Sequence, residues 1–143
     1  MSLDHTYDPA NIFAKIVRGE MPSVKVFEDE ETLAFMDVFP QTDGHVLVIH
    51  KHAHATNLLT LSEDEASAVM RTVQHVAKAV VEALQPDGLR IVQFNGTAAG
   101  QTVFHFHMHI LPMWEGRTFG RHGAGMADQA KLNALAEKIR TAL

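Results

Sequence analysis

The stretch that most constrains the fold is VFHFHMHILP, residues 103–112, in which histidine occupies every second position from 105 to 109. Alternate side chains of a β-strand lie on the same face, so His105, His107 and His109 should share one face while apolar side chains occupy the other. The apolar face anchors such a strand in a core and holds the opposite face rigid. The sequence therefore predicts a sheet that carries a row of imidazoles.

Further strand and helix patterns surround this stretch. Strands are predicted at 24–29, 31–38, 45–50, 89–94 and 103–111, and the short connections between the first three favour antiparallel pairing. A short helix should begin at Asp8 as its cap with Pro9 in the first turn, a long helix should run from the capping box at 62–65 to Leu84, and a C-terminal helix should cover 128–143. The expected class is α+β: a five-stranded antiparallel sheet with an N-terminal, a long central and a C-terminal helix packed on one face.

Length and composition restrict the function classes. A chain of 143 residues suits one domain, 1–143, in which 114–127 forms a glycine-rich loop. The net charge of −5 argues against a nucleic-acid binder, and the lack of cysteine excludes disulfides, thiol catalysis and thiolate metal sites. No apolar run is long enough for a membrane span or signal peptide, so the expected location is the cytoplasm.

Three interpretations of the histidine row remain open on spacing alone: chance, a three-histidine metal site, and catalysis by an imidazole nucleophile. The preceding loop, NGTAAGQT at 95–102, favours the third. Its glycines allow close backbone approach, and its neutral polar side chains suit phosphate oxygens, whereas a metal site would need further ligands. The candidate phosphate-binding residues of this loop are Asn95, Gly100, Gln101 and Thr102.

Two further features concern residues outside this stretch. Asp37 follows an apolar strand, where its carboxylate can accept hydrogen bonds from a ribose diol, although turn formation at a strand end explains it equally well. The segment HKHAH at 50–54 repeats the histidine spacing without apolar residues between the histidines. We therefore expect His52 and His54 to be solvated rather than functional.

GQTVFHFHMHILP resembles the signature of the histidine triad (HIT) hydrolases, His-φ-His-φ-His-φ-φ with φ apolar. The resemblance extends from NIFAKIVRGEMPSVKVFEDEETLAFMD through PQTDGHVLVIHK and covers residues 11–113. It implies a homodimer whose five-stranded sheets join across the interface. It also implies hydrolysis of purine nucleoside phosphoramidates or dinucleoside polyphosphates at the α-phosphate, through a nucleotidyl-histidine, with release of a nucleoside monophosphate. The alternative is a purine-nucleotide binding or regulatory module with incidental turnover.

The resemblance also assigns roles to individual residues. His107 matches the nucleophile, His105 and His109 its flanking histidines, His45 a fourth, upstream histidine, and Asp37 the ribose-binding acid. Asn95, Gly100, Gln101 and Thr102 match phosphate and leaving-group contacts. Five apolar residues match positions that enclose the base, although core packing would account for them as well: Ile12, Phe13, Ile16, Phe35 and Val38.

The sequence departs from the family pattern at two places: the position of a metal-binding Cys-x-x-Cys and the position of an arginine. Many bacterial relatives hold a structural zinc with a Cys-x-x-Cys whose places are Asn11 and Ala14 here, although His52 and His105 could supply the histidine half of such a site. We expect neither this zinc nor any required cofactor. Met113 stands where many relatives have an arginine, so a phosphate contact would have to come from Arg117 or Arg121, both of which we expect to be solvated.

Overall fold

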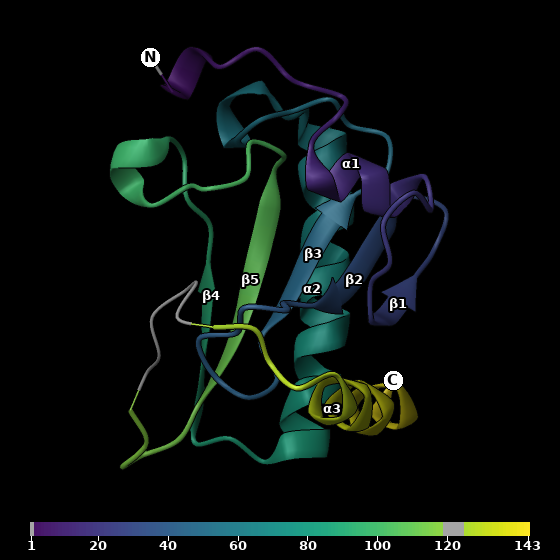
Figure 1. Ribbon diagram of the computed structural model, residues 1–143, viewed down its shortest axis with the longest axis vertical. Helices are drawn as coiled ribbons and strands as arrows, with labels where there is room; N and C mark the ends of the chain where they lie inside the picture. Colours follow the sequence, from purple (N-terminus) through teal and green to yellow (C-terminus); the bar gives the residue numbers. More distant parts are fainter. Residues whose placement is uncertain (1, 119–124) are drawn as a thin grey trace.

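The computed structural model describes residues 2–118 and 125–143 of the chain (Figure 1). Three α-helices, five β-strands and three 3-10 turns follow one another within these residues. In chain order they are η1 (Ser2–Asp4), α1 (Ile12–Val17), β1 (Lys25–Glu28), β2 (Thr32–Met36), β3 (Val46–His50), η2 (Leu58–Thr60), α2 (Glu63–Leu84), β4 (Gly88–Val92), η3 (Thr97–Ala99), β5 (His107–Met113) and α3 (Gln129–Ala142). The α+β class predicted from the sequence is confirmed.

The five strands form one antiparallel sheet in the order β1-β2-β3-β5-β4. The chain leaves β3, crosses the sheet through α2, forms the edge strand β4 and returns as β5 between β3 and β4. In this register Leu47 lies opposite His109, and Ile49 lies opposite His107. The histidine-bearing strand is therefore central, with a hydrogen-bonded neighbour on each side.

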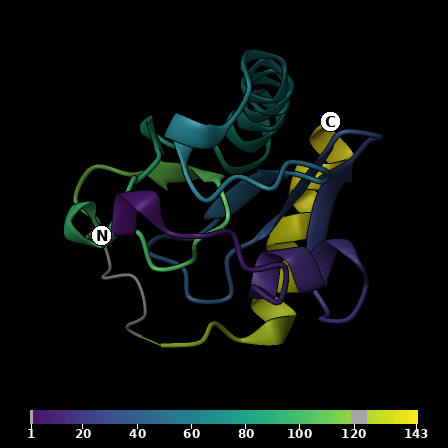
Figure 2. The ribbon, with the colours of Figure 1, turned by 90° about the horizontal axis from the view of Figure 1, so that it is seen from above.

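Helices cover both faces of the sheet, as Figure 2 shows from above. On one face, Val46, Val48 and Ile110 pack into the main core with α2, and α3 packs against α2 and β1. On the other face, Phe13 and Ile16 of α1 form a second cluster with residues of β2 and β3. The prediction that all helices pack on one face is therefore wrong. Every residue of β2 and β3 is buried, so both faces of these strands need a cover.

The predicted long helix is confirmed, and the start of the short one is corrected. Ser62 and Glu65 form a complete capping box at the start of α2, which ends at Leu84 as expected. The first helix begins at Ile12, with Asn11 and not Asp8 as its cap, because the Asp8 carboxylate accepts a hydrogen bond from Ala10 N and forms a separate turn. None of the helices in the described part of the chain is long and apolar enough to cross a membrane.

The last strand is shifted from its predicted bounds of 103–111 to His107–Met113. β3 ends at His50, and its final pair with β5 joins Ile49 to His107, so residues 103–106 have no strand to pair with. They bend instead: Gln101 Nε2 donates to Val103 O at 3.0 Å, and Phe106 N donates to Ala55 O at 2.8 Å. His105 thus precedes the strand that carries His107 and His109.

Candidate functional site

His107 opens β5 on the face that α1 covers, and it is 8% exposed. Its ring and that of Phe13 meet at right angles, with centroids 5.0 Å apart. Its Nδ1 lies 2.6 Å from the backbone oxygen of His105. A carbonyl oxygen can only accept, so Nδ1 carries the proton, and the lone pair of the neutral ring is on Nε2. The backbone therefore selects the tautomer in which Nε2 is a nucleophile or general base.

His45 and His109 form a buried hydrogen-bonded pair whose proton positions are also determined. Gln41 N donates to His45 Nδ1 at 3.1 Å, so the proton of the neutral His45 ring is on Nε2. His45 Nε2 lies 2.9 Å from His109 Nδ1, which must then accept. The proton of neutral His109 is consequently on its own Nε2, where the ring can act as a hydrogen-bond donor. His45, expected from the sequence to belong to the site, is fully buried within it.

Asp37 lies just past the end of β2, on the same face as these histidines, and is 4% exposed. One carboxylate oxygen accepts from Phe39 N at 2.8 Å, which is the turn chemistry considered from the sequence. The other, Oδ2, lies 3.5 Å from His45 Nε2. Asp37 therefore combines a structural contact with a place in the histidine cluster.

His105 is held by contacts from outside the strand. Its Nδ1 lies 3.0 Å from the Tyr7 hydroxyl, and its ring also forms a hydrogen bond with the backbone of His50. Burial lowers the pKa of His105 from 6.5 to about 4, against a smaller opposing effect of the hydrogen bond to His50. The ring is therefore neutral at physiological pH. Tyr7 was not predicted from the sequence, because it is 98 residues from His105 in the chain.

Three of the five apolar candidates lie together beside the histidines. Phe13, Ile16 and Phe35 belong to the cluster under α1, and the Phe13 ring meets Phe35 edge-on at 5.4 Å. The structure places the other two elsewhere: Ile12 is 44% exposed, and Val38 packs against the core on the opposite face. Val38 follows Asp37 directly, and successive side chains of an extended chain point to opposite faces.

The loop before β5 holds its polar side chains in internal hydrogen bonds. Gln101, 2% exposed, accepts from Gly96 N at 2.8 Å and donates to Thr56 O at 2.6 Å and to Val103 O at 3.0 Å. Asn95 accepts from Leu58 N at 2.9 Å. Both amide hydrogens of Gln101 are thus used by backbone oxygens, which points to a role in shaping the loop.

The other two candidates of this loop lie on its exposed surface. Gly100 and Thr102 are both exposed. Gly100 has a φ of +104°, in the region that favours glycine. These two residues are therefore accessible to a ligand in a way that Gln101 is not.

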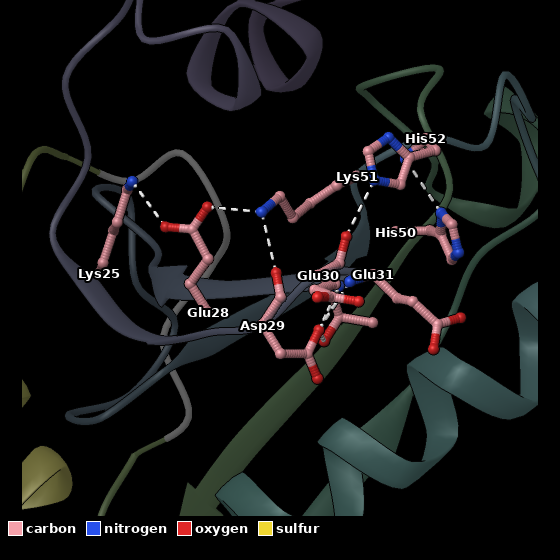
Figure 3. Close-up of polar contacts among 9 residues, drawn as sticks. Lys25, Glu28, Asp29, Glu30, Glu31, His50, Lys51 and His52 are labelled. Atoms are coloured by element: carbon pink, nitrogen blue, oxygen red, sulfur yellow. Dashed lines mark hydrogen bonds and ion pairs between the residues drawn. The ribbon is translucent and has the colours of Figure 1, made fainter.

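The HKHAH segment holds the turn between β1 and β2 against the end of β3 (Figure 3). His50 is buried, and its Nδ1 accepts from His52 N and Ala53 N, both at 3.0 Å. His52 is exposed and its Nε2 donates to Glu30 O at 2.9 Å, while Lys51 Nζ donates to Asp29 O at 2.8 Å. His52 and His54 are exposed as expected, and the contacts of His52 indicate a structural role for it.

The residues at the expected zinc position do not form a set of zinc ligands. Asn11 Oδ1 accepts from Ala14 N at 2.9 Å to cap α1, and Ala14 is a buried core residue without a ligand atom. Elsewhere in the described residues, Asp37, His45 and His109 each offer one ligand atom within 4.8 Å of one another, which is spacing that a metal ion could use. That group is distinct from the zinc position considered from the sequence.

Arg117 and Arg121 are the two arginines considered as substitutes for the missing phosphate contact. The Arg117 guanidinium lies 4.3 Å above the Trp114 ring and 4.0 Å from an Asp43 carboxylate oxygen, and its side chain is 60% exposed. Arg117 is thus solvated, as expected, and occupied by a cation–π contact. Arg121 lies outside the described residues.

Comparison with known proteins gives consistent matches over this architecture. Residues 18–116 match the HIT domain family. The chain is 41% identical to Adenosine 5'-monophosphoramidase hnt1 of Schizosaccharomyces pombe, over 71% of this chain and 72% of the relative. A Hit-like protein from Bartonella henselae, described as involved in cell-cycle regulation and solved with an unknown ligand, superposes with a TM-score of 0.89 at 45% identity, covering 96% of this chain and 99% of the other. A Zn-bound histidine triad family protein from Mycobacterium smegmatis superposes with a TM-score of 0.81 at 32% identity, covering 93% and 92%.

Proposed function

Because the chain belongs to the HIT domain family, we propose that it hydrolyses purine nucleoside phosphoramidates or dinucleoside polyphosphates at the α-phosphate. Nucleotide hydrolysis in general follows from this membership and from the monophosphoramidase relative. The observation that carries the finer proposal is the 2.6 Å contact from His107 Nδ1 to His105 O, which puts the lone pair of the nucleophile on Nε2. This interaction is built into the chain and needs no ligand to form.

The reaction has two displacements at phosphorus. In the first, His107 Nε2 forms a bond to the α-phosphorus as the bond to the amine or phosphate leaving group breaks, and an amine leaving group takes up a proton. In the second, water attacks the phosphorus, the P–N bond breaks with its electron pair returning to His107 Nε2, and the proton released by the water balances the one taken up by the amine. The nucleophile is a side chain of this protein, the second reactant is water, and the proposal requires no cofactor.

His109 is proposed to stabilise charge on the phosphoryl oxygens. The His45 contact at 2.9 Å places the proton of neutral His109 on Nε2, and a donor whose direction is set in advance is effective where charge develops. Asp37 is proposed to accept from the ribose hydroxyls, and Phe13, Ile16 and Phe35 to contribute the apolar side of the base site. Gly100 and Thr102 are accessible for phosphate contacts, whereas Gln101 and Asn95 hold the loop that presents them.

The test compares His107→Ala with a matched histidine variant, His75→Ala, on the exposed surface of α2. We expect His107→Ala to abolish turnover of an adenosine phosphoramidate with an unchanged circular dichroism spectrum, and His75→Ala to retain it. Rapid quenching with radiolabelled nucleotide should trap an acid-labile P–N adduct in the wild type. Near-normal turnover by His107→Ala would overturn the nucleophile assignment. Tight binding with uniformly poor turnover across a substrate panel would favour a regulatory nucleotide-binding module.

We also propose that the chain acts as one domain in a homodimer that joins the two β4 strands. β4 is an edge of the sheet, and beside it α2 and β4 line an apolar groove in which Met70, Val81 and Ile91 are 51%, 42% and 40% exposed. An exposed edge beside an apolar surface favours pairing with a second copy. Sedimentation should show a dimer that Ile91→Glu dissociates and that Leu59→Glu, at an exposed site on η2, leaves intact. A monomeric wild type would reject this assembly.

A further inference from the structure

The segment before α1 contacts the residues that lead into β5. The His5 ring stacks on Phe104 with centroids 4.4 Å apart and planes 9° apart. The Tyr7 ring stacks on His54 at 5.0 Å and 3°, and its hydroxyl lies 3.0 Å from His105 Nδ1. Figure 1 shows this segment passing over the end of the sheet where β3 stops and β5 begins. Two rings of an otherwise irregular segment thus hold consecutive residues, 104 and 105.

Residue 105 needs such contacts because strand pairing does not hold it. β5 pairs with β3 only from His107 onward, and the nearest backbone bond before that joins Phe106 N to Ala55 O at 2.8 Å. Yet the carbonyl of His105 accepts the Nδ1–H of His107 at 2.6 Å. That carbonyl shares a planar peptide unit with Phe106 N, so the bond to Ala55 O and the side-chain contacts of His105 together hold the group that selects the tautomer of His107.

The hydroxyl of Tyr7 is well placed for this task. A neutral imidazole has one N–H and one lone pair, and the ring of His105 also bonds to the backbone of His50, where a carbonyl can take the proton. The lone pair on Nδ1 is then matched by the phenol, which can donate. Because His105 is 3% exposed, water does not readily replace a lost partner. Asn11 and Ala14 supply no metal ligand that could fix the ring instead.

We propose that Tyr7 is a positioning residue: its hydroxyl donates to His105 Nδ1, which holds the His105 carbonyl against His107 Nδ1–H and keeps the lone pair of His107 on Nε2. The catalytic consequence rests on the proposed function. The orientation of the His105 and His107 rings does not depend on the proposed function, and it can be measured without substrate.

The experiment compares Tyr7→Phe, which keeps the stacking ring and removes only the hydroxyl, with Thr6→Val, an exposed neighbour in the same segment. Long-range 1H–15N spectra of histidine-labelled protein report the protonated nitrogen of each ring, with His105 assigned from its absence in His105→Gln. We expect the Nδ1 signal of His105 to move in Tyr7→Phe toward that of an unbonded lone pair and the His107 ring signals to change, with neither effect in Thr6→Val. The turnover rate on adenosine phosphoramidate should fall about threefold to tenfold, the value of one hydrogen bond.

The outcomes separate the two proposals. Unchanged His105 and His107 signals in Tyr7→Phe would overturn the positioning role, whatever the activity. Changed signals with a turnover rate equal to that of Thr6→Val would overturn its catalytic consequence. A wild type without turnover would reject the proposed function. The spectra would then still test the contact between Tyr7 and His105.

Discussion

Gln101 offers the sharpest test of a sequence-based role against a structural one. The sequence placed it at the phosphate, whereas its buried amide bonds to the backbone of Gly96, Thr56 and Val103. Replacing it with leucine, which is similar in size, removes three hydrogen bonds and leaves one N–H and two carbonyls without that partner. At about 1 kcal/mol for each bond, the free energy of unfolding should fall by about 3 kcal/mol.

Urea unfolding at one protein concentration measures this loss, because any dimerisation would make the midpoint depend on concentration. With a urea slope of about 1–3 kcal/mol/M, the midpoint of Gln101→Leu should fall by about 1 to 3 M. The control is Thr102→Val, an exposed residue next in the chain, whose midpoint should match the wild type. A loss below about 0.5 kcal/mol, together with a raised KM, would refute the structural argument and restore direct phosphate contact.

Three further predictions address the ribose contact, the buried imidazole and the helix cap. Asp37→Asn should raise KM about tenfold for a ribonucleotide and by less for a 2'-deoxy substrate, which offers the carboxylate one hydroxyl fewer; equal effects would reject the diol contact. The pKa of His105 is lowered from 6.5 to about 4, so between these pH values the unfolded chain binds more protons than the folded one. The free energy of unfolding should therefore fall by up to about 3 kcal/mol as the pH drops through this window. Urea titrations at several pH values should show a weaker dependence of this free energy on pH for His105→Gln. Ser62→Ala should cost about 1 kcal/mol in thermal unfolding, because Glu65 N loses its cap, and an unchanged transition would contradict the cap's role.

Local patterns predicted the elements well where neighbouring residues decide the structure. The box at Ser62 and Glu65 fixes the start of α2 through contacts three residues apart, so its position was readable. The start of α1 was misplaced because Asp8 and Asn11 are both competent caps and each forms a local turn or cap. The beginning of β5 was misplaced because it depends on where β3 ends, at His50, which is far away in the chain.

The sequence by itself determined that an antiparallel sheet would carry histidines on a rigid face, because alternation of side chains is a property of any extended strand. It also identified His45 and Asp37 as members of the same site, through the family resemblance. Only the tertiary structure decided the proton positions, because the tautomer of His107 depends on the conformation of the two residues before it and that of His109 on the His45 ring, which folding brings there. The contact of Tyr7 with His105 likewise exists only because the fold joins residues 98 positions apart, which no local pattern records.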